Sequence, residues 1–136
     1  MNKTILVDAN AFFYIVKNKP NVESIYSVLD NYEFVSISAL SLFFVETKVL
    51  RSKGVDKNLL REYMDRYRDF VAGSDVLDFT DSIIKQADKI YADTDWEDGV
   101  QVATALINKC DAVLTCDEAF RDGYNKIIKV EYVPKI

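Results

Sequence analysis

The stretch TILVDAN, residues 4–10, decides how the rest of this sequence is interpreted. Its apolar run ILV consists of β-forming residues and is typical of a strand that is buried on both faces. The run ends abruptly in a carboxylate, Asp8, and an amide, Asn10, follows two residues later. A charge at the tip of a buried strand needs a partner, so Asp8 either caps the next helix or binds a ligand.

Apolar side chains switch between strand-like and helix-like spacing along the whole chain. The pattern predicts strands at 4–7, 34–37, 76–79, 111–115 and 127–133. It predicts helices at 22–29, 38–54, 57–71, 81–92 and 96–109. Strands separated by helices favour an α/β sandwich with a mainly parallel sheet flanked by helices on both faces. No linker rich in Gly, Pro or Ser interrupts the pattern, so we expect residues 1–136 to form one domain.

Composition limits the chemistry that this chain can carry out. Histidine is absent, which excludes Ser–His and Cys–His nucleophile pairs and imidazole metal ligands. Cys110 and Cys116 are too few for a disulfide scaffold and lack zinc-knuckle spacing, and we expect Cys110 to be a buried free thiol. Any reaction must therefore depend on carboxylates, lysines, hydroxyls or a bound metal.

Charge and hydropathy limit the partners. No apolar run approaches the ~20 residues needed to cross a bilayer, and the N-terminus lacks a signal-peptide pattern, so we expect a cytoplasmic protein without a membrane partner. The 22 acidic residues outnumber the 17 basic ones, and the net charge is −5. This balance argues weakly against nucleic-acid binding and fits a site that recruits cations.

Three further acids resemble Asp8 in their placement. The expected core-facing stripe of its helix consists of Leu42, Phe43, Val49 and Leu50, and Glu46 falls on it at the i+4 position from Leu42. Asp98 starts the expected buried face of its helix, and Asp117 lies two residues beyond a predicted strand. Three of the four acids have a structural alternative: Asp8 and Asp117 can cap the helices that follow them, and Glu46 can form an ion pair or lie at the margin of its stripe.

The segment DTDWED contains more acids than helix capping requires. Thr94 and Glu97 have the spacing of a capping box, so Asp98 is not needed for that role. Asp95 and Glu118 are spare acids near the candidate set, and each stays open as an alternate ligand.

Four acids at strand tips and inward helix faces can meet at one edge of a sheet. Two carboxylates about 4 Å apart repel by about 4 kcal/mol at an effective dielectric of about 20, so such a cluster requires shared protons or cations. Oxygen ligands without histidine favour a hard ion, Mg²⁺ or Mn²⁺. These ions clamp phosphates and generate hydroxide for in-line attack, so the residues indicate metal-dependent phosphate chemistry.

The order of these motifs resembles the PIN-domain family, in particular the VapC-like toxins of prokaryotic toxin–antitoxin pairs. The resemblance covers nearly the whole chain through LVDAN, FFVETKVL, WEDGVQVATAL and TCDEAF. It implies a PIN-like three-layer sandwich. The acids that match the family's catalytic and metal-binding positions are Asp8, Glu46, Asp98 and Asp117. Asn10 and Thr115 match the polar positions that support those acids.

The resemblance also implies an activity and partners. The implied activity is hydrolysis of an RNA phosphodiester bond by a metal-activated water, with Mg²⁺ or Mn²⁺ as cofactor. The implied partners are an antitoxin protein and a second copy of the chain. Two residues depart from the family's pattern, because Gly99 stands where a larger residue is commoner and Cys116 where a basic residue is common.

Basic and aromatic residues are the candidate contacts for RNA. The densest basic stretch consists of Lys48, Arg51, Lys53, Lys57 and Arg61. It is either a phosphate-steering rim or an ordinary solvated face. The aromatic run FFY after Asp8 either stacks on bases or packs in the core or a dimer.

Two other functions stay open at this point. A phosphatase or phosphotransferase with Asp8 as nucleophile would need a second aspartate two residues later, where Asn10 stands. A catalytically inactive module would bind RNA or a protein partner, although the presence of all four acids argues against it.

Overall fold

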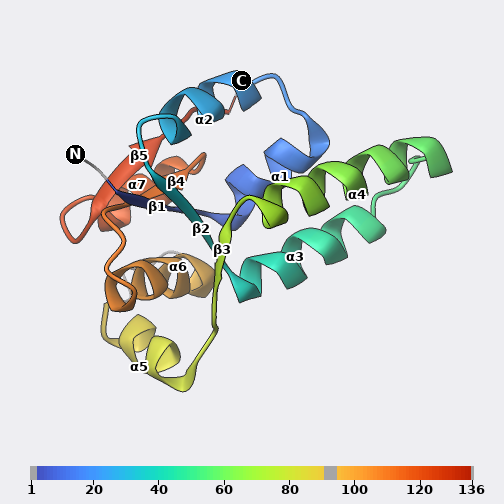
Figure 1. Ribbon diagram of the computed structural model, residues 1–136. Helices are drawn as coiled ribbons and strands as arrows, with labels where there is room; N and C mark the ends of the chain where they lie inside the picture. The colour runs from blue at the N-terminus through green and yellow to red at the C-terminus, as the bar shows by residue number, and fades with distance from the viewer. Residues whose placement is uncertain (1–2, 91–94, 136) are drawn as a thin grey trace.

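A parallel five-stranded sheet forms the centre of the molecule (Figure 1). The computed structural model describes residues 3–90 and 95–135. The strands are β1 (Thr4–Val7), β2 (Phe34–Ser38), β3 (Asp75–Leu77), β4 (Ala112–Thr115) and β5 (Lys129–Tyr132). The helices are α1 (Ala9–Lys17), α2 (Val22–Leu29), α3 (Ala39–Leu50), α4 (Lys57–Ala72), α5 (Asp81–Ile90), α6 (Trp96–Ile107) and α7 (Glu118–Tyr124). The strand order is β3-β2-β1-β4-β5, and every pairing is parallel.

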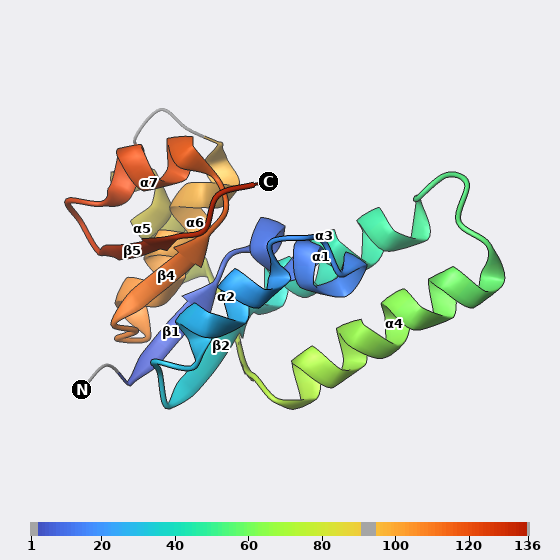
Figure 2. The same ribbon diagram turned by 90° about the horizontal axis from the view of Figure 1, so that it is seen from above.

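Helices cover both faces of the sheet, as the sequence predicts (Figure 2). Ile5 and Val7 of β1 face the core formed with α1–α4, whereas Leu6 faces the core formed with α6 and α7. All three side chains are fully buried, and burial of each contributes about 1.5–3 kcal/mol to folding. This two-sided burial explains the uninterrupted ILV run. None of the described helices is long and apolar enough to cross a bilayer.

Helix α3 begins as predicted but buries a different face. Ser38 is its N-cap, and the Ser38 hydroxyl accepts a hydrogen bond from the Leu40 amide at 3.2 Å. The buried residues of α3 are Ser41, Val45 and Val49, an i, i+4, i+8 stripe. Two members of the predicted stripe are largely exposed, Phe43 at 66% and Leu50 at 60%. The predicted core-facing position of Glu46 is therefore wrong, and its side chain is exposed.

Gly99 allows α6 to pack closely against its neighbours. A Cβ atom at this position would lie 3.3 Å from Tyr124 Oη and 3.6 Å from the Ala87 carbonyl oxygen. The glycine that departs from the family's pattern therefore permits a close approach of α5 and α7 to α6. Thr94, the expected partner of Glu97 in a capping box, lies outside the described residues.

Candidate metal centre

A pocket of about 360 Å³ opens at the carboxyl end of β1, next to β4. These two strands lie where the strand order reverses direction, which is the usual ligand-binding position in open parallel sheets. The pocket is lined by segments that are far apart in the sequence. Its acidic residues are Asp8, Asp95, Glu97, Asp98 and Asp117. Its other lining residues are Ala9, Asn10, Phe44, Val45, Thr47, Lys48 and Arg51.

Asp8 caps a helix and faces the pocket at the same time. Its Oδ1 accepts a hydrogen bond from the Ala9 amide at 2.8 Å, and its Oδ2 accepts one from Thr115 Oγ1 at 2.9 Å. The residue is only 2% exposed. Burial, together with the nearby charge of Asp98, raises the pKa of Asp8 to about 8. The capping and ligand interpretations of Asp8 are therefore compatible.

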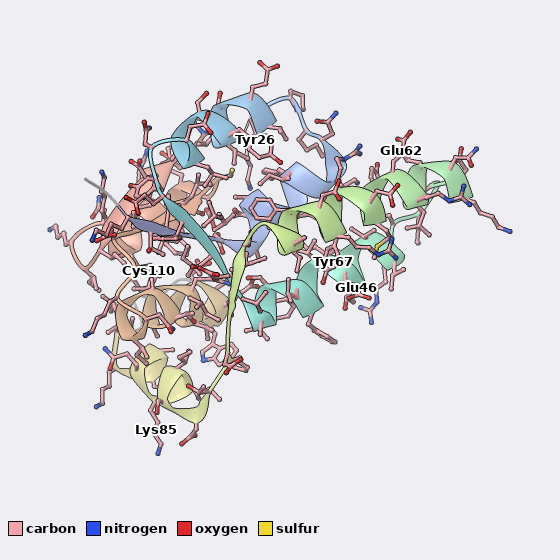
Figure 3. The ribbon with its side chains drawn as sticks, in the orientation of Figure 1. Tyr26, Glu46, Glu62, Tyr67, Lys85 and Cys110 are labelled. Carbon is pink, nitrogen blue, oxygen red and sulfur yellow. The ribbon has the colours of Figure 1, made fainter. Side chains whose placement is uncertain are left out.

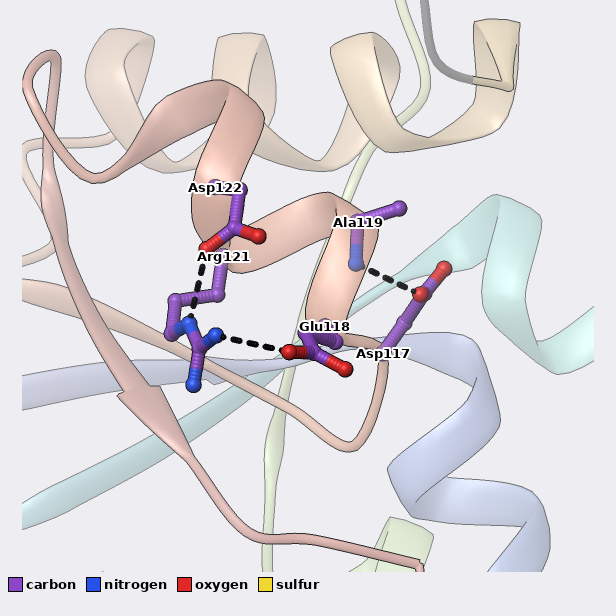
Figure 4. Close-up of polar contacts among 5 residues, drawn as sticks. All are labelled: Asp117, Glu118, Ala119, Arg121 and Asp122. Atoms are coloured by element: carbon purple, nitrogen blue, oxygen red, sulfur yellow. Dashed lines mark hydrogen bonds and ion pairs between the residues drawn. The ribbon is translucent and has the colours of Figure 1, made fainter.

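The Thr115 hydroxyl links two of the pocket acids. It donates to Asp8 Oδ2 and accepts a hydrogen bond from the Asp117 amide at 3.1 Å. The Asp117 carboxylate in turn caps α7 by accepting from the Ala119 amide at 3.0 Å (Figure 4). Asn10 supports the same edge, since its Oδ1 accepts a hydrogen bond from the Cys116 amide at 3.2 Å. These bonds hold the turn after β4 against the end of β1.

The first turn of α6 brings two adjacent acids to the pocket. Asp98 is 7% exposed, so its predicted inward orientation is confirmed. Glu97 is half-buried and lines the same pocket. Burial raises the pKa of Glu97, and Lys48 acts in the opposite direction. The sequence interpretation assigned Glu97 to capping alone and missed its place in the pocket. The acid-rich run DTDWED is the signal that identifies it.

Glu46 does not reach the pocket. It lies two residues from Phe44 and from Lys48, which line the pocket, and two residues along a helix correspond to a rotation of about 200°. Its Oε2 instead accepts a hydrogen bond from Tyr67 Oη at 3.4 Å, between α3 and α4 (Figure 3). Burial and the Glu46 charge raise the pKa of Tyr67 to about 12. Glu46 is thus a surface contact between two helices.

Of the two spare acids, only Asp95 lines the pocket. Glu118 is directed away from it and forms an ion pair with Arg121, with Oε1 and Nη2 3.2 Å apart (Figure 4). Its side chain is 70% exposed, so this pair contributes little to stability.

The predicted basic stretch divides between the pocket and the far end of the α3–α4 pair. Lys48 and Arg51 line the pocket. Lys53, Lys57 and Arg61 are exposed along the part of the α3–α4 pair that extends beyond the sheet (Figure 1).

The aromatic run after Asp8 mainly packs inside the protein. Phe12 is fully buried and stacks on Tyr67 and Phe70, with ring centroids 5.4 and 5.2 Å apart. Phe13 is half-buried, and the Lys48 ammonium lies 5.1 Å from the centre of its ring. Core packing is therefore the role of Phe12, whereas Phe13 helps to position a pocket cation.

The donors of the pocket fit a hard divalent cation. All its acidic ligand atoms are carboxylate oxygens, and both cysteines are free, buried thiols whose pKa burial raises to about 11. The buried Asp8 next to Asp98 needs a proton or a cation to offset its charge. In residues 3–90 and 95–135, no three acidic or cysteine side chains already converge closely enough to hold an ion. The acids therefore surround the pocket without meeting at one point.

The raised pKa of Asp8 predicts how stability depends on pH. A carboxyl group whose pKa is about 8 when folded and 3.8 when unfolded stabilises the fold below the lower value. We therefore expect the metal-free protein to lose a few kcal/mol of unfolding free energy as pH rises from about 4 to about 8. Urea unfolding at a series of pH values measures this loss. Asp8→Asn is expected to flatten the dependence, and equal slopes in both proteins would contradict the role of Asp8.

Comparisons with known proteins identify solved structures that have a similar fold. No curated protein sequence is similar enough to count as a match. FitAcB from Neisseria gonorrhoeae is similar in structure, with a TM-score of 0.71, 22% identity, and coverage of 93% of this chain and 95% of that chain. VapBC2 from Rickettsia felis, bound to a promoter DNA fragment, has a TM-score of 0.70 and 14% identity, with coverage of 95% and 98%. VapBC from Salmonella typhimurium, also bound to DNA, has a TM-score of 0.67 and 17% identity, with coverage of 97% and 98%.

Structural similarity at such low sequence identity shows the fold alone. A separate comparison shows the family. The family model for the PIN domain matches residues 5–126, which include β1 from Ile5 onward, β4 and every acid that lines the pocket. The resemblance inferred from the four sequence motifs is thereby confirmed, and this chain belongs to the PIN domain family.

Proposed function

We propose that this chain is a Mg²⁺- or Mn²⁺-dependent endoribonuclease that hydrolyses RNA phosphodiester bonds as the toxin of a toxin–antitoxin pair. One observation carries the proposal: Asp8, Asp98 and Asp117 come from three distant segments and line one pocket at the sheet edge. Membership of the PIN domain family supports it. The RNA substrate implies that the protein acts in the cytoplasm.

Each pocket residue has a role in this proposal. Asp8, Asp98 and Asp117 hold the cation, and Thr115 orients Asp8 and the turn that carries Asp117. A divalent ion held by these residues would supply a clamp for the phosphate and would make water acidic enough to act as the nucleophile. Asn10 keeps the turn after β4 in place through its bond to the Cys116 amide.

The basic wall of the pocket positions the substrate. Lys48 lies in the last turn of α3 and Arg51 is the C-cap of that helix; both line the same pocket as the acids of α6 and bind the phosphates that flank the scissile bond. Lys53, Lys57 and Arg61 extend the same positive surface away from the pocket. The negative net charge of the chain does not prevent this, because a bound cation reverses the charge of the site itself.

The proposed partners are an antitoxin and a second copy of the chain. The similar structures include a toxin–antitoxin complex from Klebsiella pneumoniae, with a TM-score of 0.69, 13% identity, and coverage of 93% of this chain and 95% of that chain. Phe43 and Leu50 provide apolar surface on α3 that is exposed in the single chain. Exposed apolar side chains of this kind are typical of surfaces that bind other proteins.

A binding module without catalysis is the second candidate. The observation that favours it is the position of Glu46, because α3 contributes no acid to the pocket. Such a module would bind RNA or a protein partner through the same basic wall.

The test is cleavage of labelled RNA in the presence of Mn²⁺ or Mg²⁺. We expect cleavage that stops when EDTA is added and resumes when excess Mn²⁺ is restored. Chelation removes the ion that clamps the phosphate and activates the water, so the loss is expected to be complete. Cleavage that persists in EDTA would rule out the metal mechanism. Binding of RNA without cleavage under all these conditions would favour the inactive module.

A further inference from the structure

We infer that Glu97, in the first turn of α6, supplies the fourth carboxylate of the metal centre, in a pocket whose α3 side is basic. The inference rests on the proposed function. The inference gives Glu97 of α6 the metal-ligand role that the motif FFVETKVL implied for Glu46 of α3. The argument depends on which face each helix turns toward the pocket.

Helix α3 presents cations to the pocket where an acid was expected. Its lining residues from Phe44 to Arg51 fall on one side of the helix, and Lys48 and Arg51 are the charged ones. Glu46 lies about 200° from Lys48 around the helix and contacts Tyr67 of α4. A change of side-chain rotamer does not bring the Glu46 carboxylate to the pocket, because the backbone of α3 lies between this side chain and the pocket.

Helix α6 presents acids to the same pocket. Glu97 lines the pocket and is half-buried, and Gln101 lies one helical turn further along the same face. Gln101 Nε2 donates to Ser41 Oγ of α3 at 2.8 Å, and both residues are fully buried. This bond ties α6 to α3 one helical turn beyond Glu97.

The same glutamine leaves one buried polar atom unpaired. Within the part of the chain that the structure describes, Gln101 Oε1 is a buried side-chain oxygen without a hydrogen-bond partner. A buried acceptor of this kind normally binds a water molecule or another donor.

The presence of acids on α6 and of cations on α3 has a chemical consequence. The acids that line the pocket come from the end of β1, the first turn of α6 and the turn after β4, whereas the cations Lys48 and Arg51 come from the last turn and the C-cap of α3. Metal ligands and phosphate-binding cations would thereby come from different elements, and one phosphodiester could contact both.

Metal binding without RNA tests this assignment. We propose isothermal titration of the full chain with Mn²⁺, comparing wild type, Glu97→Gln, Glu46→Gln and Asp8→Asn. Glu97→Gln is expected to raise the Mn²⁺ dissociation constant by about ten- to a hundredfold. Glu46→Gln is the matched control, because it makes the same chemical change on the side of α3 turned away from the pocket, and is expected to stay within about twofold. Melting in EDTA is expected to be the same for wild type and Glu97→Gln.

The outcomes separate this inference from the proposed function. If Glu97→Gln binds Mn²⁺ like wild type while Asp8→Asn does not, the assignment of Glu97 is wrong and the metal centre stands. The assignment is also overturned if Glu46→Gln weakens binding more than Glu97→Gln, or if Glu97→Gln unfolds in EDTA where wild type is folded. If wild type fails to bind Mn²⁺, the proposed function itself fails.

Discussion

Asp8→Asn is expected to lower the rate of RNA cleavage by about a thousandfold and to leave the folded state intact. The substitution removes the charge of the most deeply buried pocket acid, which is 2% exposed. Loss of about 4 kcal/mol of transition-state stabilisation by the bound ion corresponds to this factor. Single-turnover cleavage of labelled RNA at saturating Mn²⁺ measures it.

The folded state is expected to tolerate this change for two reasons. Asparagine is as good an N-cap as aspartate, so the hydrogen bond from the Ala9 amide can be kept. The mutation also removes a carboxylate whose burial raises its pKa to about 8, so its ionised form opposes folding at neutral pH. Glu46→Gln serves as the control and is expected to cleave RNA at the wild-type rate. An active Asp8→Asn protein would refute the mechanism.

Thr115→Val is expected to slow cleavage by about ten- to a hundredfold at saturating metal. The valine has nearly the same shape but loses the hydroxyl that donates to Asp8 Oδ2 and accepts from the Asp117 amide. Loss of residues that orient metal ligands typically has an effect of this size. The unfolding free energy is expected to fall by about 1–3 kcal/mol, because the buried Asp8 Oδ2 loses its donor and the part-buried Asp117 amide loses its acceptor. Kinetics and urea unfolding measure the two effects separately.

Thr104→Val provides a matched control for this prediction. Thr104 is also fully buried, but its hydroxyl donates to the Val100 carbonyl oxygen of its own helix at 2.7 Å. We expect this variant to keep wild-type cleavage at saturating metal. Equal losses of activity in both variants would indicate a general packing effect, and Thr115 would then have no specific role in orienting the acids.

The sequence alone determined the fold and three of the pocket acids. An uninterrupted apolar run such as ILV predicts a strand that is buried on both faces, and the alternation of strands with helices predicts a parallel sheet. Both patterns can be recognised from short stretches of the sequence. Asp8 and Asp117 follow strands, and the carboxyl ends of parallel strands meet at one sheet edge. Asp98 could be assigned because it shares helical spacing with the apolar residues Val102 and Ala105, although α6 is in fact buried on all sides from Asp98 to Ala105.

Tertiary structure alone decided that α6 places Glu97 in the pocket and that α3 places no acid there. The run LSLFFV is apolar nearly throughout, so its periodicity does not define which side of α3 is buried. The polar residue Ser41 belongs to the core because Gln101 bonds to it from α6, a contact across 60 positions of sequence. That contact turns Glu46 toward Tyr67 and leaves Glu97 facing Lys48. The local sequence of α3 does not predict its contact with Gln101, because the rotation of a helix about its own axis depends on the surface against which it packs.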